Sequence, residues 1–272
     1  MARWTSSPIN RRTFLSSVAA GAAAAPMVGC KDPGDSDGGG SIDHVVFLMM
    51  ENRSFDHYFG GLMHDEGRSD VLVFPQGFTN PHPSGGDIAP ANASLHCIAD
   101  PPHSWSSCHE QFNEGAMDGF LRTMVQRHPS YDSPEEVMGY YQRSQLPVLY
   151  ALADEYSLCQ RWFSSVMSST WPNRFYSHAA QNTGVRGNDM PSGPMRTLWH
   201  QLDEAGLDWH VYHASIPFSA LLELPDAQDH FDFIEVFFEH AKAGTLPAVT
   251  MLEPPYGIWD DHPPAHPLHG QL

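Results

Sequence analysis

The chain has 272 residues, and 32 acidic against 14 basic side chains give it a formal net charge of -18. A surface this acidic repels phosphate backbones and anionic lipid headgroups, which argues against nucleic-acid binding but leaves room for a small phosphate ester beside a bound cation. The length is sufficient for one α/β domain, and the 17 histidines are many, in a residue type suited to metal ligation, phosphate contact and proton transfer.

The N-terminus has the pattern of a targeting segment. Asn10 to Leu15 contain the twin arginines Arg11 and Arg12, and an apolar stretch rich in Ala and Gly follows from Val18 to Val28. That stretch is too short and too weakly apolar for a comfortable membrane span. We therefore expect export by the twin-arginine translocase, with the mature protein periplasmic, secreted or anchored at the cell envelope.

The sequence is consistent with two alternative processing sites at the end of this signal. Ala22 to Ala25 offer a small-residue cleavage site, whereas Met27 to Cys30 resemble a lipobox whose cysteine would carry a lipid. Residues 1–30 then form the signal segment, the Gly- and Asp-rich residues 31–40 a flexible linker, and residues 41–272 the folded domain.

The first element of that domain is an apolar run from Val45 to Met50 that stops abruptly at Glu51 and Asn52. A run this short predicts a strand buried on both faces. The carboxyl ends of strands form the edge at which α/β sheets build their sites, so Glu51 and Asn52 are candidate oxygen ligands. A strand followed by an ordinary polar turn would have the same sequence pattern.

Helices and strands alternate along the rest of the chain, after a long loop rich in Pro, Gly and Asn over residues 74–102. This alternation predicts the α/β class, with a mostly parallel sheet flanked by helices on both faces. Periodicity, capping residues and breakers predict helices over Glu110–Arg127, Leu146–Cys159, Arg196–Ala205 and Phe231–Ala243, another helix starting at Thr170, and strands over 207–213 and 246–252.

The cysteines suggest a disulfide more readily than a metal site. Cys97 and Cys108 flank a short loop and could pair in an oxidising compartment. Cys159 lies in an apolar segment and is expected to be a buried thiol. Because no CxxC pair or other zinc spacing occurs, a thiolate metal site is not expected.

Thr170 is the most chemically suggestive hydroxyl. It stands two residues before Pro172, at a predicted helix start, where backbone N–H groups and the helix dipole favour an anion. Beside a divalent cation such a hydroxyl becomes a nucleophile for phosphorus. An ordinary N-cap is the more common role of a threonine in this position.

Imidazoles and carboxylates elsewhere offer further candidates. His103, on the long loop, could bind a phosphoryl oxygen or protonate a leaving group, and His109 is a weaker candidate for the same role. The run Asp260-Asp261-His262 is either a site for a hard cation or a polar turn before two prolines.

Several ordered segments together resemble the bacterial phospholipase C and acid phosphatase phosphoesterase family, over essentially all of residues 41–272. The family is similar in fold to alkaline phosphatases and sulfatases, so the resemblance implies an alkaline-phosphatase-like fold. The segments are Asp43 to Asp56 with Phe59-Gly60, His103-Ser104-Trp105, Gly115 to Phe120, Thr170-Trp171-Pro172-Asn173-Arg174 and Asp261-His262-Pro263-Pro264.

The resemblance implies a metal-dependent phosphoric ester hydrolase whose substrate is a small phosphate ester or a phospholipid. Glu51, Asn52 and Thr170 would be ligands of a divalent metal ion, and Thr170 would also be the nucleophile that forms a phospho-enzyme intermediate. His103 and His262 would contact the phosphoryl group and help to protonate the leaving oxygen. A further histidine is implied before the strand over 246–252, for which His230 is our choice; Arg174 receives no catalytic role.

The family pattern continues beyond this sequence, which ends at Gln271-Leu272. Family members carry a later strand with an acidic pair that completes the metal site, so we expect a C-terminally incomplete fold with an exposed sheet edge and weak or absent activity. The alternative is an exported, non-catalytic protein of the same fold that binds phosphate or lipid. A sulfatase-like esterase is disfavoured because no Cys-x-Pro-x-Arg pattern occurs.

Overall fold

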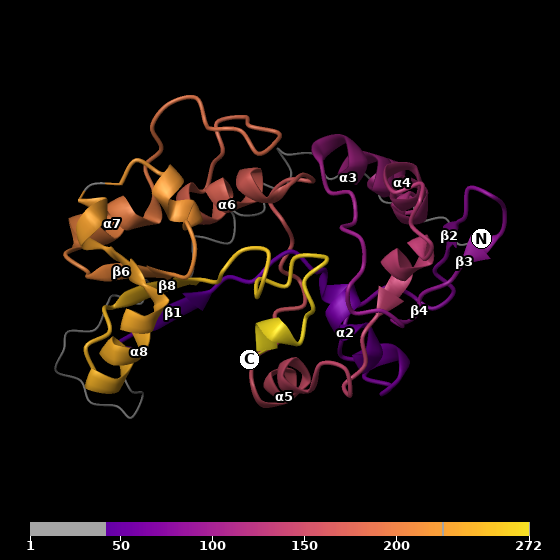
Figure 1. Cartoon of the computed structure of the whole chain (residues 1–272), viewed down its shortest axis with the longest axis horizontal. Coiled ribbons are helices and arrows are strands. Elements are labelled where there is room, and N and C mark those ends of the chain that lie inside the picture. The colour runs from indigo at the N-terminus through magenta and orange to yellow at the C-terminus, as the bar shows by residue number, and fades with distance from the viewer. Residues whose placement is uncertain (1–41, 225, 272) are drawn as a thin grey trace, which may run out of the picture. The chain divides into compact units, whose positions relative to one another are not determined.

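Four parallel strands form the central sheet of the protein, in the order β1, β8, β6, β7 (Figure 1). The computed structural model describes residues 42–224 and 226–271, so the twin arginines, Cys30 and the linker predicted over 31–40 lie outside the described residues. The strands are β1 (Val45–Leu48), β6 (Trp209–His213), β7 (Phe231–Phe233) and β8 (Val249–Glu253).

Helices cover both faces of this sheet, as predicted. On one face α6 (Thr170–Ala179) and α7 (Leu198–Ala205) pack against Trp209, Val211 and Met251 to form the main apolar core. On the other face lies α8 (Ile234–Ala243), where the Tyr212 hydroxyl meets His240 Nδ1 at 2.7 Å (Figure 1). The α/β class with a mostly parallel sheet is therefore confirmed.

The prediction that the first strand is buried on both faces is wrong. β1 pairs only with β8 among the described residues, and each of its four side chains is at least two-fifths exposed. An edge strand lacks a neighbour on one side, so its apolar side chains are covered from one direction only. The apolar run identified the strand but not its place in the sheet.

A second group of helices follows β1, and its first and last members contribute Leu62 and Tyr150 to a second core that also holds Val71, Tyr141 and Leu146. These helices are α2 (Phe55–His64), α3 (Trp105–Phe112), α4 (Phe120–Arg127) and α5 (Pro147–Glu155). The predicted loop over residues 74–102 holds only two-residue strands, which are β2 (Asn80–Pro81), β3 (Asp87–Ile88) and β4 (Ala91–Asn92); β4 pairs with β5 (Gly139–Tyr140).

Short 3-10 helices connect several of these elements. They are η1 (Asn113–Gly115), η2 (Pro134–Met138), η3 (Phe218–Leu221), η4 (Ala227–Asp229) and η5 (His269–Gln271). No helix among residues 42–224 and 226–271 is long and apolar enough to cross a bilayer.

Several predicted helices have the wrong extent, including the one predicted over Leu146–Cys159, which ends at Glu155. The helix predicted over Glu110–Arg127 is two helices, because Asn113, Gly115 and Met117 take positive φ angles of 40°, 97° and 55° that end α3 before α4 begins. The helix predicted from Phe231 starts only at Ile234, because residues 231–233 pair with β6 as β7. Tertiary pairing thus overrides the helical spacing there.

Other boundaries agree with the sequence. Pro147 lies in the first turn of α5, and Gly206 ends α7 in the left-handed conformation with φ 66°. Thr197 precedes α7 in a capping box with His200.

The predictions for Cys97, Cys108 and Cys159 are wrong. Cys97 and Cys108 are free thiols rather than a disulfide, and Cys159 is exposed because it lies beyond the end of α5.

Candidate active site

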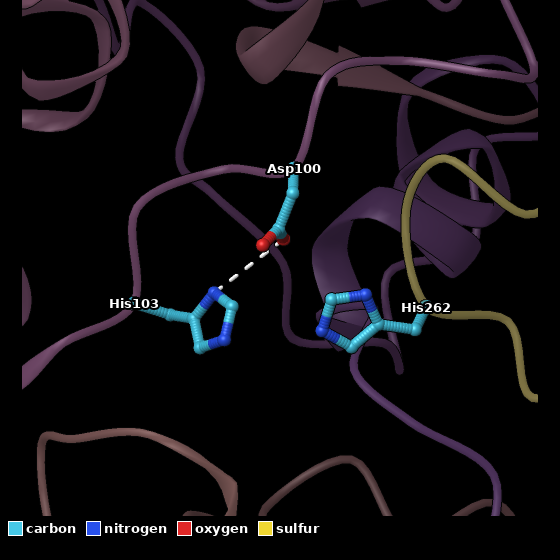
Figure 2. Close-up of side chains that lie close together, drawn as sticks. All are labelled: Asp100, His103 and His262. Carbon is cyan, nitrogen blue, oxygen red and sulfur yellow. Dashed lines mark ion pairs between the residues drawn. The ribbon is translucent and has the colours of Figure 1, made fainter. Parts of the chain in front are cut away.

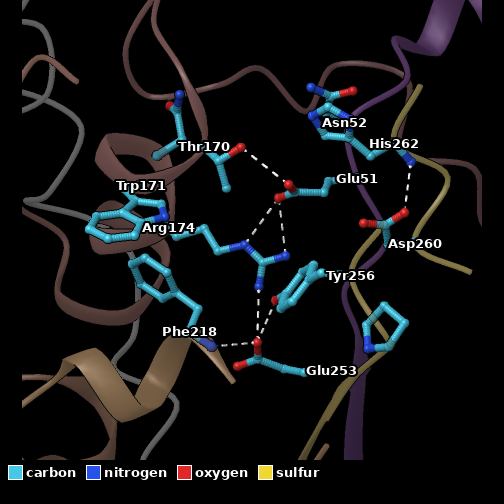
Figure 3. A network of polar contacts seen from close by, with 12 residues as sticks. Glu51, Asn52, Thr170, Trp171, Arg174, Phe218, Glu253, Tyr256, Asp260 and His262 are labelled. Carbon is cyan, nitrogen blue, oxygen red and sulfur yellow. Dashed lines mark hydrogen bonds and ion pairs between the residues drawn. The ribbon is translucent and has the colours of Figure 1, made fainter. Parts of the chain in front are cut away.

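Three segments that are distant in sequence meet at the carboxyl edge of the sheet. Glu51 follows β1, Glu253 is the last residue of the neighbouring strand β8, and Thr170 opens α6 (Figure 3). The Thr170 hydroxyl donates to Glu51 Oε1 at 3.2 Å. The predicted pairing of the acidic residue after the first strand with the hydroxyl at a helix start is therefore present in the fold.

The start of α6 is fixed by side chains around Thr170. Ser169 is the N-cap and Thr170 the first helical residue, so the prediction that Thr170 could itself be the cap is wrong by one position. The Asn173 amide donates to the carbonyls of Val166, Ser168 and Ser169 and thereby ties the incoming loop to the helix. The Trp171 N–H donates to Asn188 Oδ1 at 2.9 Å.

Arg174 connects Glu51 to Glu253 beneath Thr170 (Figure 3). Its Nε and Nη2 donate to Glu51 Oε2 at 3.2 and 3.1 Å, and its Nη1 lies 3.5 Å from Glu253 Oε2. The side chains of Arg174 and Glu253 are only 4% and 1% exposed, whereas that of Glu51 is 17% exposed. The guanidinium is therefore held inside the protein, while the carboxylate of Glu51 reaches towards the surface.

Glu253 is anchored independently of Arg174. Its carboxylate accepts from the N–H of Phe218 at 2.8 Å, from the N–H and hydroxyl of Ser219 at 3.4 and 3.1 Å, and from the Tyr256 hydroxyl. Burial, with Glu253 as the next cause, raises the pKa of Tyr256, so the phenol stays protonated and donates. The ring of Tyr256 also lies 5.3 Å from the Arg174 guanidinium.

A second cluster lies on the Asn52 side of the site and contains Asp100, His103 and His262 (Figure 2). The Asn52 amide nitrogen is 3.5 Å from His103 Nε2, and the rings of His103 and His262 are 5.5 Å apart. His103 Nδ1 lies 2.8 Å from the Pro101 carbonyl and 3.5 Å from Asp100 Oδ1. A protonated Nδ1 donates to the Pro101 carbonyl, which leaves Nε2 facing Asn52.

Two sets of side chains could hold a cation here. Glu51, Asn52 and Thr170 carry oxygen donors, which suit a hard divalent ion, although only one of the three is a carboxylate. One ligand atom each from Asp100, His103 and His262 lies within 4.8 Å of the others, a spacing that also fits a metal ion. The first set consists of the predicted ligands, whereas the second set was not predicted as a metal site.

The run Asp260-Asp261-His262 forms a turn. Asp260 accepts from the N–H groups of Gly257 and His262 at 2.6 and 3.1 Å, as a turn residue does. Asp261 is buried, and burial is the main cause that raises the pKa of its carboxyl. The run therefore forms a polar turn, and from this turn His262 joins the cluster with Asp100 and His103.

Arg53 holds this turn in place. Its Nε donates to the Asp261 carbonyl at 2.8 Å, and its Nη2 donates to the carbonyls of Ala265 and His96 at 2.9 and 3.3 Å. One side chain thus fastens the segment that carries His262 to the loop that leads to His103.

The structure does not bring His230 to this edge. His230 precedes β7 and donates through Nδ1 to the Trp209 carbonyl, 2.8 Å away, with its ring stacked on Trp209. Both residues lie where their parallel strands begin, which is the opposite edge of the sheet from Glu51 and Glu253. His109 is likewise occupied locally, since its Nδ1 lies 2.7 Å from the Trp105 carbonyl.

Sequence reasoning missed Glu253, Asp100 and the contact between Arg174 and Glu51. A signal for Glu253 was available, because it ends a predicted strand in the same way as Glu51 follows the first one. No local pattern distinguishes Asp100 from the other loop carboxylates, since its place depends on how the long loop folds.

Known proteins resemble this chain throughout the described domain. The sequence pattern of the phosphoesterase family matches residues 42–272. Phospholipase C B of Mycobacterium tuberculosis is 35% identical over 199 residues, which cover 63% of this chain and 38% of that protein. Non-specific phospholipase C3 of Arabidopsis thaliana is 31% identical over 269 residues, which cover 87% of this chain and 51% of that protein.

Hemolytic phospholipase C of Pseudomonas aeruginosa is 34% identical over 196 residues, which cover 63% of this chain and 25% of that protein. The chain therefore spans about half or less of the length of these relatives.

Proposed function

The chain belongs to the phosphoesterase family, and from this premise we propose that it hydrolyses phosphoric esters with Thr170 as the nucleophile and a divalent cation as cofactor. One observation carries the proposal. The Thr170 hydroxyl lies at the start of α6 and donates to Glu51 Oε1 at 3.2 Å. A hydroxyl in that position has an acceptor for its proton and a helix terminus that favours an anion beside it.

In the first step Thr170 Oγ1 attacks phosphorus and its proton passes to solvent water, because Glu51 Oε1 is the oxygen that would hold the cation. The new oxygen–phosphorus bond forms while the bond from phosphorus to the leaving oxygen breaks, which yields a phosphothreonine. Water then attacks the same phosphorus as the bond from phosphorus to Thr170 Oγ1 breaks. Phosphate or a phosphomonoester is released, and Oγ1 takes a proton from solvent to restore the hydroxyl. A divalent cation held by Glu51, Asn52 and Thr170 would lower the pKa of the hydroxyl and balance the charge on phosphorus.

His103 and His262 are suited to protonate the leaving oxygen. Their rings lie 5.5 Å apart beside Asn52, and His103 Nε2 faces Asn52 rather than a carbonyl. His103 Nδ1 is held by the Pro101 carbonyl and by Asp100, which favours a fixed ring orientation. A histidine in this role acts as an imidazolium: it gives its Nε2 proton to the departing oxygen and then takes a proton from the attacking water.

The substrate class is a small phosphate ester or a phospholipid. The named relatives are phospholipases C, which supports a phosphodiester lipid. Because Glu51 is the one carboxylate among the three proposed ligands, and hard cations usually take about six to eight oxygens, we expect weak cation binding and low turnover by this chain.

The test is hydrolysis of p-nitrophenyl phosphate and p-nitrophenyl phosphorylcholine with added Mn²⁺ and after treatment with a chelator. We expect metal-dependent release of p-nitrophenol that is abolished in Thr170→Ala and partly retained in Thr170→Ser, which keeps a hydroxyl. Turnover in Thr170→Ala, or turnover that survives the chelator, contradicts the proposal. Binding of phosphorylcholine without any turnover would instead favour a non-catalytic phosphate- or lipid-binding protein.

We also propose that the chain is exported by the twin-arginine translocase. The support is the pair Arg11 and Arg12 before an Ala-rich apolar stretch. Replacing both with lysine is expected to leave the protein in the cytoplasm, as measured by cell fractionation, while Cys30→Ser separates lipid anchoring from simple secretion. Unchanged export of the double-lysine variant would exclude this route.

A further inference from the structure

Arg174 has no assigned role in the proposed reaction, yet it is the most completely enclosed cation of the described residues near Thr170. Its side chain is 4% exposed, and it lies between the carboxylates of Glu51 and Glu253 (Figure 3). Aromatic rings also contact it, with Phe218 at 5.8 Å and Tyr256 at 5.3 Å from the guanidinium. A guanidinium held on several sides has little freedom to follow a moving partner.

The contact divides the two oxygens of Glu51 between two partners. Nε and Nη2 of Arg174 both donate to Oε2, at 3.2 and 3.1 Å, whereas Oε1 accepts from the Thr170 hydroxyl. Two donors on one oxygen fix the plane of the carboxylate as well as its position. Oε2 is thereby committed, and only Oε1 remains free to meet a cation.

The hold on Arg174 does not depend on Glu51. Glu253 accepts four protein donors besides Arg174 and is itself 1% exposed, so it is a fixed anchor for Nη1. Arg174 also lies one helical turn after Thr170 on α6, so one helix carries both the nucleophile and the group that orients its partner.

We propose that Arg174 is a positioning residue that restricts Glu51 to a single-oxygen ligand aligned with Thr170. The inference rests on the proposed function, because it concerns the same nucleophile and cation. Without the guanidinium, Glu51 can turn and offer both oxygens to a cation, which moves the cation away from the Thr170 hydroxyl. Loss of Arg174 also removes a positive charge that opposes cation binding.

The inference predicts that turnover and cation affinity respond differently to Arg174→Gln. We expect kcat to fall on the order of 100-fold, as small misplacements of reacting groups do. The dissociation constant for Mn²⁺, measured by calorimetry without substrate, should stay unchanged or fall severalfold. Arg174→Lys keeps the buried charge but cannot donate twice to Oε2. Its kcat should therefore lie between those of wild type and Arg174→Gln. Arg143→Gln is the matched control, because Arg143 pairs with Glu66 and Asp154 at the surface.

Crystal structures of Arg174→Gln and Arg174→Lys provide a measurement that needs no metal. The Glu51 carboxylate should leave the Thr170 hydroxyl in the glutamine variant. Retention of the 3.2 Å contact there, or a joint loss of kcat, Mn²⁺ affinity and thermal stability, would overturn the positioning role and point to a structural one. A wild type that neither binds Mn²⁺ nor hydrolyses either ester would refute the proposed function, and the crystal structures would still decide the role of Arg174.

Discussion

Glu51 is the residue on which the proposed chemistry depends most, because each of its oxygens has a different partner. Glu51→Gln keeps an oxygen for the Thr170 hydroxyl but removes the negative charge that a cation needs. We expect Mn²⁺ affinity to fall by roughly tenfold or more and hydrolysis to be nearly lost. Calorimetry and the p-nitrophenyl assay measure the two effects, with the surface variant Glu66→Gln as the control. Unchanged Mn²⁺ affinity in Glu51→Gln would indicate that the cation binds at the cluster of Asp100, His103 and His262 instead.

His178 makes the stability of the protein sensitive to acid. Burial lowers the pKa of this imidazole from 6.5 to about 4, and its Nδ1 accepts from the Trp199 indole N–H at 3.1 Å. Between these two pH values His178 binds a proton in the unfolded chain but stays neutral in the folded chain. The stability that the neutral His178 contributes to the folded state is fully present above pH 6.5. It is lost as the pH falls to 4, which lowers the free energy of unfolding by up to about 3 kcal/mol.

His178→Asn isolates this effect, because the asparagine oxygen can replace Nδ1 as the acceptor for Trp199 but does not titrate. Urea unfolding of the variant at pH 7, 5.5 and 4 should show a shallower pH dependence than wild type. His57, whose pKa burial lowers to about 3, and Asp261, whose pKa burial raises, remain in both proteins and cancel in the comparison. The exposed His269→Asn should keep the wild-type slope, and a parallel profile for His178→Asn would contradict the assignment.

At the scale of elements, α3 and α4 pack closely because Gly119 has no side chain. A Cβ at this position would stand 2.8 Å from Gln111 Cα and closer still to the Glu110 carbonyl, both of which are backbone. Gly119→Ala must therefore separate the two helices, at a cost of roughly 1–3 kcal/mol in the free energy of unfolding. Chemical denaturation measures this loss.

Gly187→Ala is the matched control for that substitution. A Cβ there would meet only the flexible carboxylate of Asp189, at 3.0 Å, so stability should change little. Equal stabilities for Gly119→Ala and Gly187→Ala would show that the contact between α3 and α4 is looser than described.

At the scale of the whole molecule, β1 is an apolar edge strand of the described sheet. Its side chains are 40% to 58% exposed, and its outer backbone groups meet no strand among the described residues. Such an edge is a template for pairing between copies, and a lysine on it opposes that pairing. Val46→Lys should therefore reduce self-association at high protein concentration, as measured by sedimentation velocity.

The charge of the molecule provides the control for this experiment. Since the chain already carries a net charge of -18, any added lysine brings the charge nearer to zero, which by itself favours association. Gln181→Lys makes the same change of charge on an exposed loop. Val46→Lys should associate less than Gln181→Lys. The opposite order would show that the edge of β1 does not mediate self-association.

Much of the sheet could be predicted from local sequence, because its strands are short apolar runs bounded by turn residues. The strands at 45–48 and 209–213 lie within predicted segments, the strand at 249–253 ends one residue beyond its predicted segment, and Gly206 and Gly244 end their helices as expected. β7 could not be predicted, because its three residues also fit the spacing of the helix that follows. Only pairing with β6 decides their conformation.

For the site, the sequence by itself determined which groups stand at element ends: a carboxylate after the first strand, a hydroxyl at a helix start and imidazoles on the connecting loops. Those positions follow from local periodicity and capping, which neighbouring residues control. Only the tertiary structure decided which groups meet. It joined Thr170 and Arg174 to Glu51, brought Asp100 to His103, and left His230 at the other edge of the sheet. Such contacts depend on strand order and on the course of long loops, which are set by packing across the whole core.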